Sequence, residues 1–289
     1  MNDLVCSRVL VGRDCCLSLE QPGMVAVLNV TPDSFSDGGT YLPVAAAVER
    51  GLEMEAEGAA VLDIGGESTR PGARPVPVDE ELERVIPVIE GLRRHSSIPL
   101  SVDTSKSQVA REALSSGANF VNDISGLTFD ADMAGVVASA GAGVFLMHTR
   151  GRPDVMQQHT DYRDLLAEVI DFLRAGVHRA CVAGISRERV AVDPGIGFAK
   201  SVHGNLELMS HLGLFHQFGC PVLLGTSRKS FIGNILQQDD PRQRLYGTLA
   251  TVALGVAQGV QLFRVHDVRA AREAALVAWA IREQRLPLV

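Results

Sequence analysis

Residues 61–75 read VLDIGGESTRPGARP, a short apolar run that breaks into two glycines and then into a polar loop containing prolines. The run carries a carboxylate, Asp63, where a buried strand normally has an apolar side chain. An amphipathic stretch follows at 78–94. The segment therefore predicts a β-strand, a loop rich in functional side chains and an α-helix, and it raises the possibility of a binding surface at the strand end.

Seven more apolar runs are bounded by turn residues in the same way, at 24–30, 99–104, 120–125, 143–149, 190–195, 221–227 and 261–267. Each run is nearly continuous rather than alternating, which is typical of parallel strands that are buried on both faces. Helical patterns separate the runs, at 43–58, 78–94, 107–117, 130–140, 162–184, 241–259 and 268–284. This alternation predicts an α/β fold of the (β/α)8 TIM-barrel type.

A doubly wound open sheet is the main alternative fold. It is disfavoured because neither G-x-G-x-x-G nor G-x-x-x-x-G-K-[ST] follows the first strand, where a nucleotide-binding sheet would carry it. No change in composition marks a linker, so we expect one domain over residues 1–289. Within it, residues 1–20 should form a short N-terminal β-hairpin that closes the barrel bottom, and residues 21–289 should form the barrel.

Composition narrows the class of protein. The chain has 289 residues and a formal net charge of −7, which argues against a nucleic-acid partner. Its longest apolar stretch, 249–260, is too short to span a bilayer and contains two glycines. The N-terminus lacks a secretory leader, and five cysteines without C-x-x-C spacing favour reduced thiols. These features predict a cytoplasmic protein without a membrane partner.

Polar or ionisable side chains stand at or near the carboxyl end of every predicted strand. They are Asn29, Asp63, Asp103, Asn122 with Asp123, His148, Asp193, Ser227 with Arg228 and Lys229, and Arg264 with His266. In a (β/α)8 barrel these ends converge on one mouth. Any one of them could be a cap or a buried anchor for its own loop, and Asp63 is the strongest case. The full set predicts a ligand site, because polar groups fixed in an apolar barrel need partners.

The side-chain types at the mouth indicate the chemistry of the ligand. A set of cations from several strands suits a pyrophosphate or phosphorylated substrate; it comprises Arg70, Lys229, Arg264 and His266, with Asn29 as a neutral ligand. Carboxylates and an amide suit a flat heterocycle rich in N–H donors; these are Asp103, Asp193 and Asn122. Helix capping is the alternative role for both aspartates.

Two other features point to the same end of the barrel. The loop at 31–39, TPDSFSDGG, carries Phe35, which favours a lid with an aromatic contact over a plain surface turn. Only three of the 27 basic residues are lysines, and all three follow strands on the side of the mouth: Lys106, Lys200 and Lys229. Their placement is a weak indication that a compact positive charge is needed there.

Several segments resemble the signature segments of the dihydropteroate synthase family. They are LNVTPDSFSDGG (28–39), DIGGESTRPGA (63–73), SVDTSK (101–106), VNDISG (121–126), DPGIGF (193–198), GTSRKSFIG (225–233) and RVHDV (264–268). The resemblance runs in order from residue 24 to the C-terminus, with one segment for each strand, and its segments are long enough to be specific.

The resemblance implies a homodimeric (β/α)8 barrel that joins p-aminobenzoate to 6-hydroxymethyl-7,8-dihydropterin pyrophosphate and requires Mg²⁺. The products are 7,8-dihydropteroate and pyrophosphate, and sulfonamides compete with p-aminobenzoate. The C–O bond to pyrophosphate would break first, leaving a pterin-stabilised methylene cation that the arylamine attacks. Mg²⁺ and the basic cluster would stabilise the leaving group.

By position, the resemblance implies a role for each matching residue. The pterin pocket comprises Asp103, Asn122, Asp193 and Lys229. The pyrophosphate and metal site comprises Asn29, Arg70, Arg264 and His266, with Asn29 as the metal ligand. The p-aminobenzoate pocket comprises Phe35, Asp37, Thr69, Pro71, Phe198, Lys229 and Ser230. The residues expected to act in catalysis are Asp103, Asp193, Lys229, Arg264 and His266.

The sequence departs from the family pattern in two loops. Thr149 and Arg150 stand where members commonly read MHMxG, Ala199 replaces a usual glycine, and Gly204 replaces a common histidine. These changes put the contacts of both loops in doubt but remove no residue assigned above. Two rival functions are a non-catalytic pterin-binding paralogue and a corrinoid-linked methyltetrahydrofolate methyltransferase. The retained anion-site residues argue against the first, and the STRPG and SRKS loops argue against the second.

Overall fold

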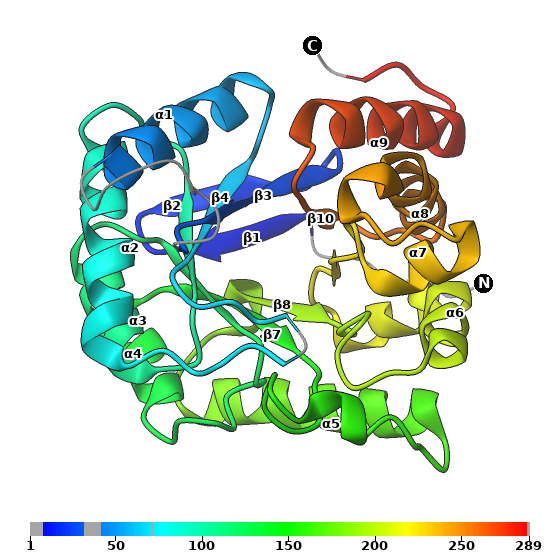
Figure 1. The fold of residues 1–289 in the computed structure, drawn as a ribbon, viewed down its shortest axis with the longest axis horizontal. Helices are drawn as coiled ribbons and strands as arrows, with labels where there is room; N and C mark the ends of the chain where they lie inside the picture. Colours follow the sequence, from blue (N-terminus) through cyan, green and yellow to red (C-terminus); the bar gives the residue numbers. More distant parts are fainter. Residues whose placement is uncertain (1–7, 32–41, 71, 288–289) are drawn as a thin grey trace.

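The computed structural model of the chain describes residues 8–31, 42–70 and 72–287. Eight parallel strands form its centre: β3 (Gly23–Asn29), β4 (Val61–Gly65), β5 (Leu100–Asp103), β6 (Phe120–Asp123), β7 (Gly143–Met147), β8 (Val190–Asp193), β9 (Leu223–Leu224) and β10 (Leu262–Val265). Their order is β8-β7-β6-β5-β4-β3-β10-β9, and a bridge between Val192 and Val222 joins the two edges. The strands therefore close into the predicted barrel (Figure 1).

Helices surround the strands. They are α1 (Leu42–Ala56), α2 (Val78–Arg93), α3 (Ser107–Ser115), α4 (Met133–Ala140), α5 (Leu165–Val182), α6 (Val202–Ser210), α7 (Ser230–Leu236), α8 (Leu245–Ala257) and α9 (Val268–Glu283). Short 3-10 helices lie at Met156–Gln158, Arg187–Arg189, Leu212–Phe218 and Pro241–Arg244. In the described part of the chain, no helix combines the length and apolar character needed to cross a bilayer.

The sequence predicts two parts of the helical layer imperfectly. The helix expected at 241–259 begins as a 3-10 turn, because the Asp240 side chain accepts a hydrogen bond from the Arg242 amide (2.9 Å) and only then does α8 start. No helix is expected where α6 and α7 lie. α7, with seven residues, is too short for a clear amphipathic period, and α6, with nine, has a weaker one than the equally long α3.

The core has two layers, one inside the barrel and one between the strands and the helices. Every residue of β4, β5, β6, β7 and β8 is buried, which explains their nearly continuous apolar runs. The lower interior is filled by Val25, Val61, Phe120, Phe145, Ala191, Leu223 and Leu262. Polar residues of the strands are concentrated at the opposite, carboxyl end of the barrel.

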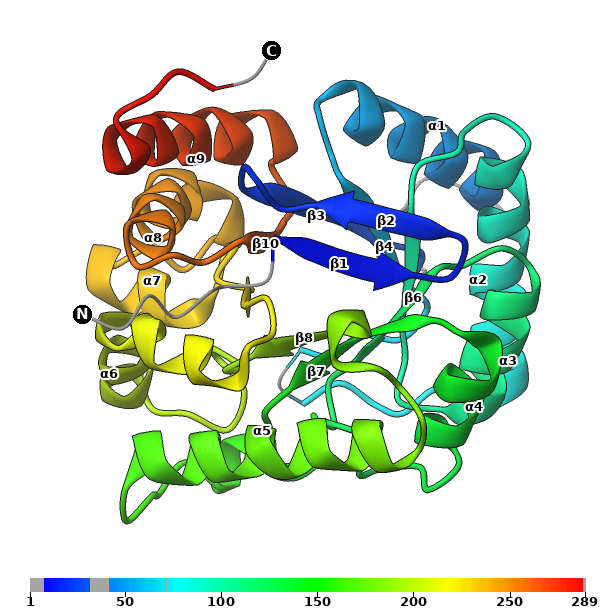
Figure 2. The same ribbon diagram turned by 180° about the vertical axis from the view of Figure 1, so that it is seen from behind.

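An N-terminal hairpin covers the bottom of the barrel, as predicted. Its strands, β1 (Val9–Gly12) and β2 (Cys15–Ser18), pair antiparallel, and Leu10 and Leu17 join the lower interior cluster. The Asn119 side chain donates to the Arg13 carbonyl at 2.7 Å, and the Arg13 amide donates to the Asn119 carbonyl at 3.0 Å. Figure 2 shows the hairpin across this face. Ligand access is therefore confined to the other end.

Candidate active site

A guanidinium and two carboxylates lie at the centre of the mouth. Arg264, near the end of β10, donates from Nε to Asp63 Oδ2 and from Nη2 to Asp103 Oδ2, both at 2.6 Å. Asn122, on β6, donates from Nδ2 to the same oxygen of Asp63 at 2.9 Å. Asp63 therefore orients two site residues. The hydrogen-bond partners of Asp63 in the described part of the chain come from β6 and β10, and not from the loop that follows β4.

Asp63 and Asp103 each keep one buried oxygen, Oδ1, without a hydrogen-bond partner among the described residues. Buried acceptors of this kind normally have a donor, and a ligand N–H is one. Burial raises the pKa of Asp103 to about 7, and the nearby Asp63 charge adds to this although Arg264 opposes it. The carboxylate is thus held in a setting that favours a donor from a ligand.

Asp193 and Lys229 form the second part of the mouth. Asp193, at the end of β8, accepts a hydrogen bond from the Gly195 amide (2.7 Å) through Oδ1, and burial raises its pKa to about 6. Burial lowers the pKa of Lys229 to about 8; the Arg264 charge lowers it further, and Asp193 opposes the change. The Lys229 ammonium lies 4.0 Å from the centre of the Phe198 ring. This ion therefore rests on an aromatic face beside a carboxylate.

Gly197 explains how Lys229 reaches that face. The backbone of Gly197 has a φ of +84°, and a Cβ at this position would lie 3.0 Å from Lys229 Cδ. A larger residue would be strained by its φ and would also press on the lysine stem. The second glycine of GIGF, Gly197, is thus required by the packing of Lys229.

His266 does not act as a cation, which corrects the expectation of a four-cation set. Burial and the charges of Arg228 and Arg264 lower its pKa to about 3. Its Nδ1 lies 2.9 Å from Ser227 Oγ, which itself accepts the His266 amide proton at 3.2 Å. The serine hydroxyl is thus free to donate to Nδ1. With the serine hydroxyl as the donor to Nδ1, the ring proton is on Nε2, where a neutral imidazole can donate to an anion.

The other two residues that are expected to bind the anionic group are Arg70 and Asn29. Arg70 is exposed, and its charge contributes to the lowered pKa of His266, so the two are near neighbours. Asn29 ends β3 and is separated from Asp103 by Gly65 of β4: a Cβ on Gly65 would lie 3.6 Å from both Asn29 Oδ1 and Asp103 Cβ. Among the described residues there is no group of three or more His, Cys, Asp or Glu side chains that could hold a metal. One amide oxygen beside a phosphate site matches how Mg²⁺ binds when substrate oxygens supply most of its ligands.

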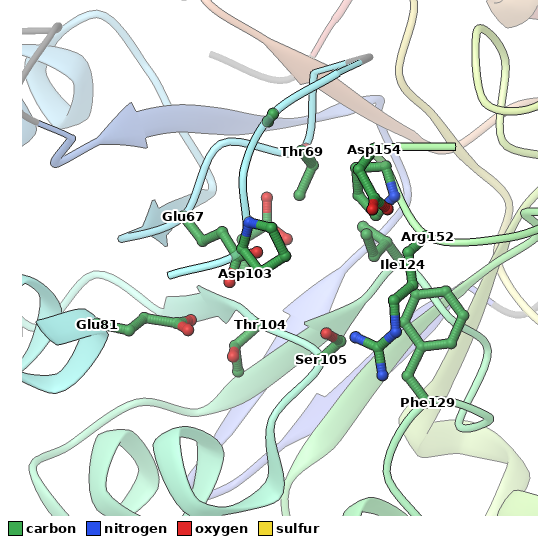
Figure 3. A pocket seen from close by; sticks show the side chains of 13 residues that line it. Glu67, Thr69, Glu81, Asp103, Thr104, Ser105, Ile124, Phe129, Arg152 and Asp154 are labelled. Carbon is green, nitrogen blue, oxygen red and sulfur yellow. The ribbon is translucent and has the colours of Figure 1, made fainter. Parts of the chain in front are cut away.

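A cavity lies between the loops that follow β4 and β7 (Figure 3). The two loops are joined by a hydrogen bond from the Gly72 amide to the Pro153 carbonyl (3.0 Å). Thr69 and Asp103 line the cavity from one side and Ile124 from another. Ile124 also packs in one cluster with Phe198. Ile124 therefore connects the cavity lining to the cluster that contains Phe198.

Comparisons with known proteins agree with this geometry. A family described as pterin binding enzyme matches residues 25–266. The dihydropteroate synthase of a Synechocystis species is 47% identical over 89% of each chain, and that of Escherichia coli is 43% identical over 94% of this chain and 95% of its own. The chain belongs to the dihydropteroate synthase family. It is therefore a transferase of folate biosynthesis rather than either of the two rivals.

Solved structures of dihydropteroate synthases support the same assignment. That of Xanthomonas albilineans with 4-aminobenzoic acid superposes with a TM-score of 0.89 at 45% identity, covering 96% of this chain and all of the other. That of Yersinia pestis with a sulfonamide drug complex gives 0.89 at 41% identity, covering 95% and 99%. The barrel and its mouth are thus shared with this family.

The structure brings together several residues that the sequence assigns to this site. Asp103, Asn122 and Arg264 are linked by hydrogen bonds through Asp63 and Arg264, and the charges of Arg264 and Asp193 act on Lys229. Ser230 begins α7 directly after Lys229. Phe35, Asp37 and Pro71 lie outside the described residues. Asp123 takes the capping role instead, because its carboxylate accepts the Ser125 and Leu127 amides, each at 2.8 Å.

Sequence reasoning missed one ionic cluster beside the synthase site. The Lys106 ammonium is ion-paired with Glu67 and with the buried Glu81. Glu67 stands just before Thr69 in the loop after β4, and Glu81 belongs to α2. The pairs therefore fix the base of that loop. The only signal in the sequence was the retention of a lysine at a strand end, which names no partner.

Proposed function

We propose that this chain binds the pterin ring among Asp103, Asn122, Asp193 and Lys229. The buried carboxylate oxygens would accept the ring N–H and amino protons, and the Asn122 amide and Lys229 ammonium would serve the ring oxygen and nitrogen acceptors. The observation that carries the proposal is the buried Oδ1 atom of Asp103, which has no partner among the described residues. Arg264 holds this carboxylate in position from the other side.

The pyrophosphate would be bound at the rim by Arg70, by the Nε2–H of His266 and by Lys229. Arg264 contributes mainly by fixing Asp63 and Asp103, because two of its nitrogens are already used by these carboxylates. Asn29 would supply a protein oxygen for Mg²⁺. When bound, Mg²⁺ supplies positive charge that stabilises the departing pyrophosphate.

The p-aminobenzoate would lie against Phe198 and Thr69, near Ser230 and Lys229. The cavity beside Thr69 and the Lys229–Phe198 contact support this placement. Phe35, Asp37 and Pro71 would complete the pocket by the family resemblance. An aromatic acid suits a site that combines an aromatic side chain with a cation.

In the proposed reaction the C–O bond between the pterin methylene and the pyrophosphate breaks heterolytically. The electron pair leaves with the pyrophosphate, and Arg70, His266 and Lys229 stabilise its charge. The arylamine nitrogen then forms the new C–N bond to the methylene carbon and loses one proton to water. Asp103 and Asp193 favour the electron-poor pterin by their negative charge. The chain's main contribution is to hold the two substrates in contact and in order.

Turnover tests the proposal directly. The purified chain, given both substrates and Mg²⁺, should form one pyrophosphate per dihydropteroate, and the rate should fall to background on chelation. Lys229→Ala serves as the inactive reference. If the wild type forms no more product than Lys229→Ala, the proposal is wrong. If turnover continues after chelation, the reaction does not require Mg²⁺.

We also propose that the chain is a homodimer. Large apolar side chains are exposed on the adjoining helices α7, α8 and α9: Ile235, Leu236, Tyr246, Leu254, Val277 and Ile281. Such a patch on one side of a molecule marks a protein-protein interface. Sedimentation of the purified chain should give twice its mass of 30.9 kDa, and a monomer at micromolar concentration would contradict the proposal.

The free thiols of Cys16 and Cys181 fit the expected cytoplasmic location.

A further inference from the structure

Lys200 is a buried lysine for which the reaction above has no use. Its exposed fraction is 4%, and its ammonium lies 2.9 Å from His148 Nδ1 and donates to the Phe198 carbonyl at 2.8 Å. Among the described residues no carboxylate lies within ion-pair distance of it. Removing an amine from water without an anionic partner is costly, and here it lowers the pKa of Lys200 to about 7. A group kept at such a cost calls for an explanation.

The acceptor of one of its hydrogen bonds belongs to the wall of the site. The Phe198 carbonyl precedes Ala199, whose φ of +50° is in the left-handed region although it has a side chain. This conformation costs a non-glycine residue about 1 kcal/mol or more and persists only when its surroundings hold it. Tyr162 Oη donates to the Ala199 carbonyl at 3.0 Å. Two side chains, Lys200 and Tyr162, thus hold consecutive carbonyls of this turn.

The other partner of Lys200 is itself fixed. His148 follows β7, is 2% exposed and lies edge-on to the Phe172 ring at 4.8 Å between ring centres. Burial and the charges of Lys200 and Arg150 hold the pKa of His148 far below its ordinary value, so the neutral ring can accept a hydrogen bond from Lys200 through Nδ1. Lys200 therefore joins the loop after β7 to the loop after β8.

The unusual loop residues reinforce the same turn. Arg150, which departs from the family pattern, lies 4.0 Å from the centre of the Tyr162 ring and is ion-paired with Glu168 on α5. It therefore supports the ring whose hydroxyl holds the Ala199 carbonyl. The departures at Arg150 and Ala199 are thus structurally connected through Tyr162.

We infer that Lys200 is a positioning residue for p-aminobenzoate: with His148 it holds the Phe198 carbonyl, so that the Phe198 ring supports the Lys229 ammonium at the aminobenzoate side of the site. The inference rests on the proposed assignment of Phe198 and Lys229 to that side. Lys200 acts through these residues and touches no substrate. Its loss should disturb the pterin side less, because Asp103, Asn122 and Asp193 hold the ring there and only Lys229 is shared between the two sides.

Lys200→Met tests this, because methionine keeps the apolar stem and removes the donor. The KM for p-aminobenzoate should rise about tenfold, the effect expected for about 1.4 kcal/mol of lost positioning, and the KM for the pterin pyrophosphate should change less than about twofold. His148→Leu, which removes the acceptor, should behave in the same way. His148→Asn, which can place an amide oxygen where Nδ1 lies, should restore much of the wild-type value.

Arg189→Met is the matched control. Arg189 also donates to two carbonyls, Gly12 at 2.9 Å and Gly141 at 2.5 Å, but at the barrel bottom. It should lower stability and leave both KM values unchanged. Equal rises in both KM values of Lys200→Met, or no rise beyond that of the control, would overturn the inference. If Lys200→Met does not fold, equal p-aminobenzoate KM values for His148→Leu and His148→Asn would overturn it. An inactive wild type would instead refute the proposed reaction.

Discussion

Replacement of Arg264 by methionine should abolish measurable turnover and lower the free energy of unfolding at neutral pH by about 3–5 kcal/mol. Arg264 is the cation that Asp63 and Asp103 share, at 2.6 Å from each, and Asp63 is fully buried. Removing it leaves two buried carboxylates without their counter-charge. Urea unfolding followed by circular dichroism measures the loss of stability, and product formation measures the loss of activity.

The pH dependence of this loss separates charge from packing. Burial raises the folded-state pKa of Asp103 even when Arg264 is present, and it should rise further without that cation. A carboxyl with a raised folded pKa contributes stability that is present at low pH and lost as it ionises. The gap between wild type and Arg264→Met should therefore widen above about pH 7, where Asp103 ionises in the folded wild type and stays protonated in the folded variant. A gap independent of pH would show that lost packing, rather than charge, dominates.

Arg264→Lys is the matched control for charge alone. Lysine keeps a cation but lacks the planar set of donors that spans both carboxylates. We expect the lysine variant to recover part of the stability and little of the activity, because Asp63 and Asp103 would no longer be held in one geometry. Full activity in this variant would contradict the positioning role of the guanidinium.

The second large effect is expected at Lys229. Lys229→Met should reduce kcat/KM by about 10²–10³-fold, the size typical of removing a charge-stabilising donor from an active site. Stability should hardly fall, because burial lowers the pKa of this lysine and so disfavours its charged form. Loss of activity without loss of stability would mark Lys229 as a functional rather than a structural residue.

The same variant should change the shape of the pH profile. In the wild type, kcat/KM should fall above about pH 8 as Lys229 loses its proton, and below about pH 7 as first Asp103 and then, near pH 6, Asp193 gains one. Lys229→Met should lose the alkaline decline and keep the acid one. Lys229→Arg should remain charged yet poorly active, because the space between Gly197 and Phe198 fits the narrow lysine side chain and not the wider guanidinium of arginine. If kcat/KM still declines at alkaline pH in Lys229→Met, the decline is caused by a group other than Lys229.

Much of the barrel could be predicted because each strand carries its own local pattern. The run at 61–65 and its seven counterparts are mostly apolar, as expected for strands with both faces buried. The strand-end positions of Asp103, Asp193 and Lys229 follow from the same register. What local pattern cannot supply is a partner: Asp63 and Arg264 are separated by 201 residues along the chain. Nothing near either residue indicates that they meet.

The charge states at the site were also beyond the sequence. His266 was expected as a cation, but its burial near Arg228 and Arg264 makes it neutral. Lys200 was noted only as a retained lysine, and its contacts with His148 and Phe198 depend on how two loops pack together. These properties arise from burial and from neighbours brought by other strands. They become predictable only when the tertiary structure is known.

The central claim is that the carboxylates at the mouth recognise the pterin while the rim recognises the pyrophosphate. Calorimetric titration of 6-hydroxymethylpterin, which lacks the pyrophosphate, tests it most directly. Asp193→Asn should weaken this binding at least about 100-fold, because the amide puts a donor against a ligand donor, and Arg70→Ala should leave it unchanged. Equal affinity of Asp193→Asn and wild type for 6-hydroxymethylpterin would contradict the account.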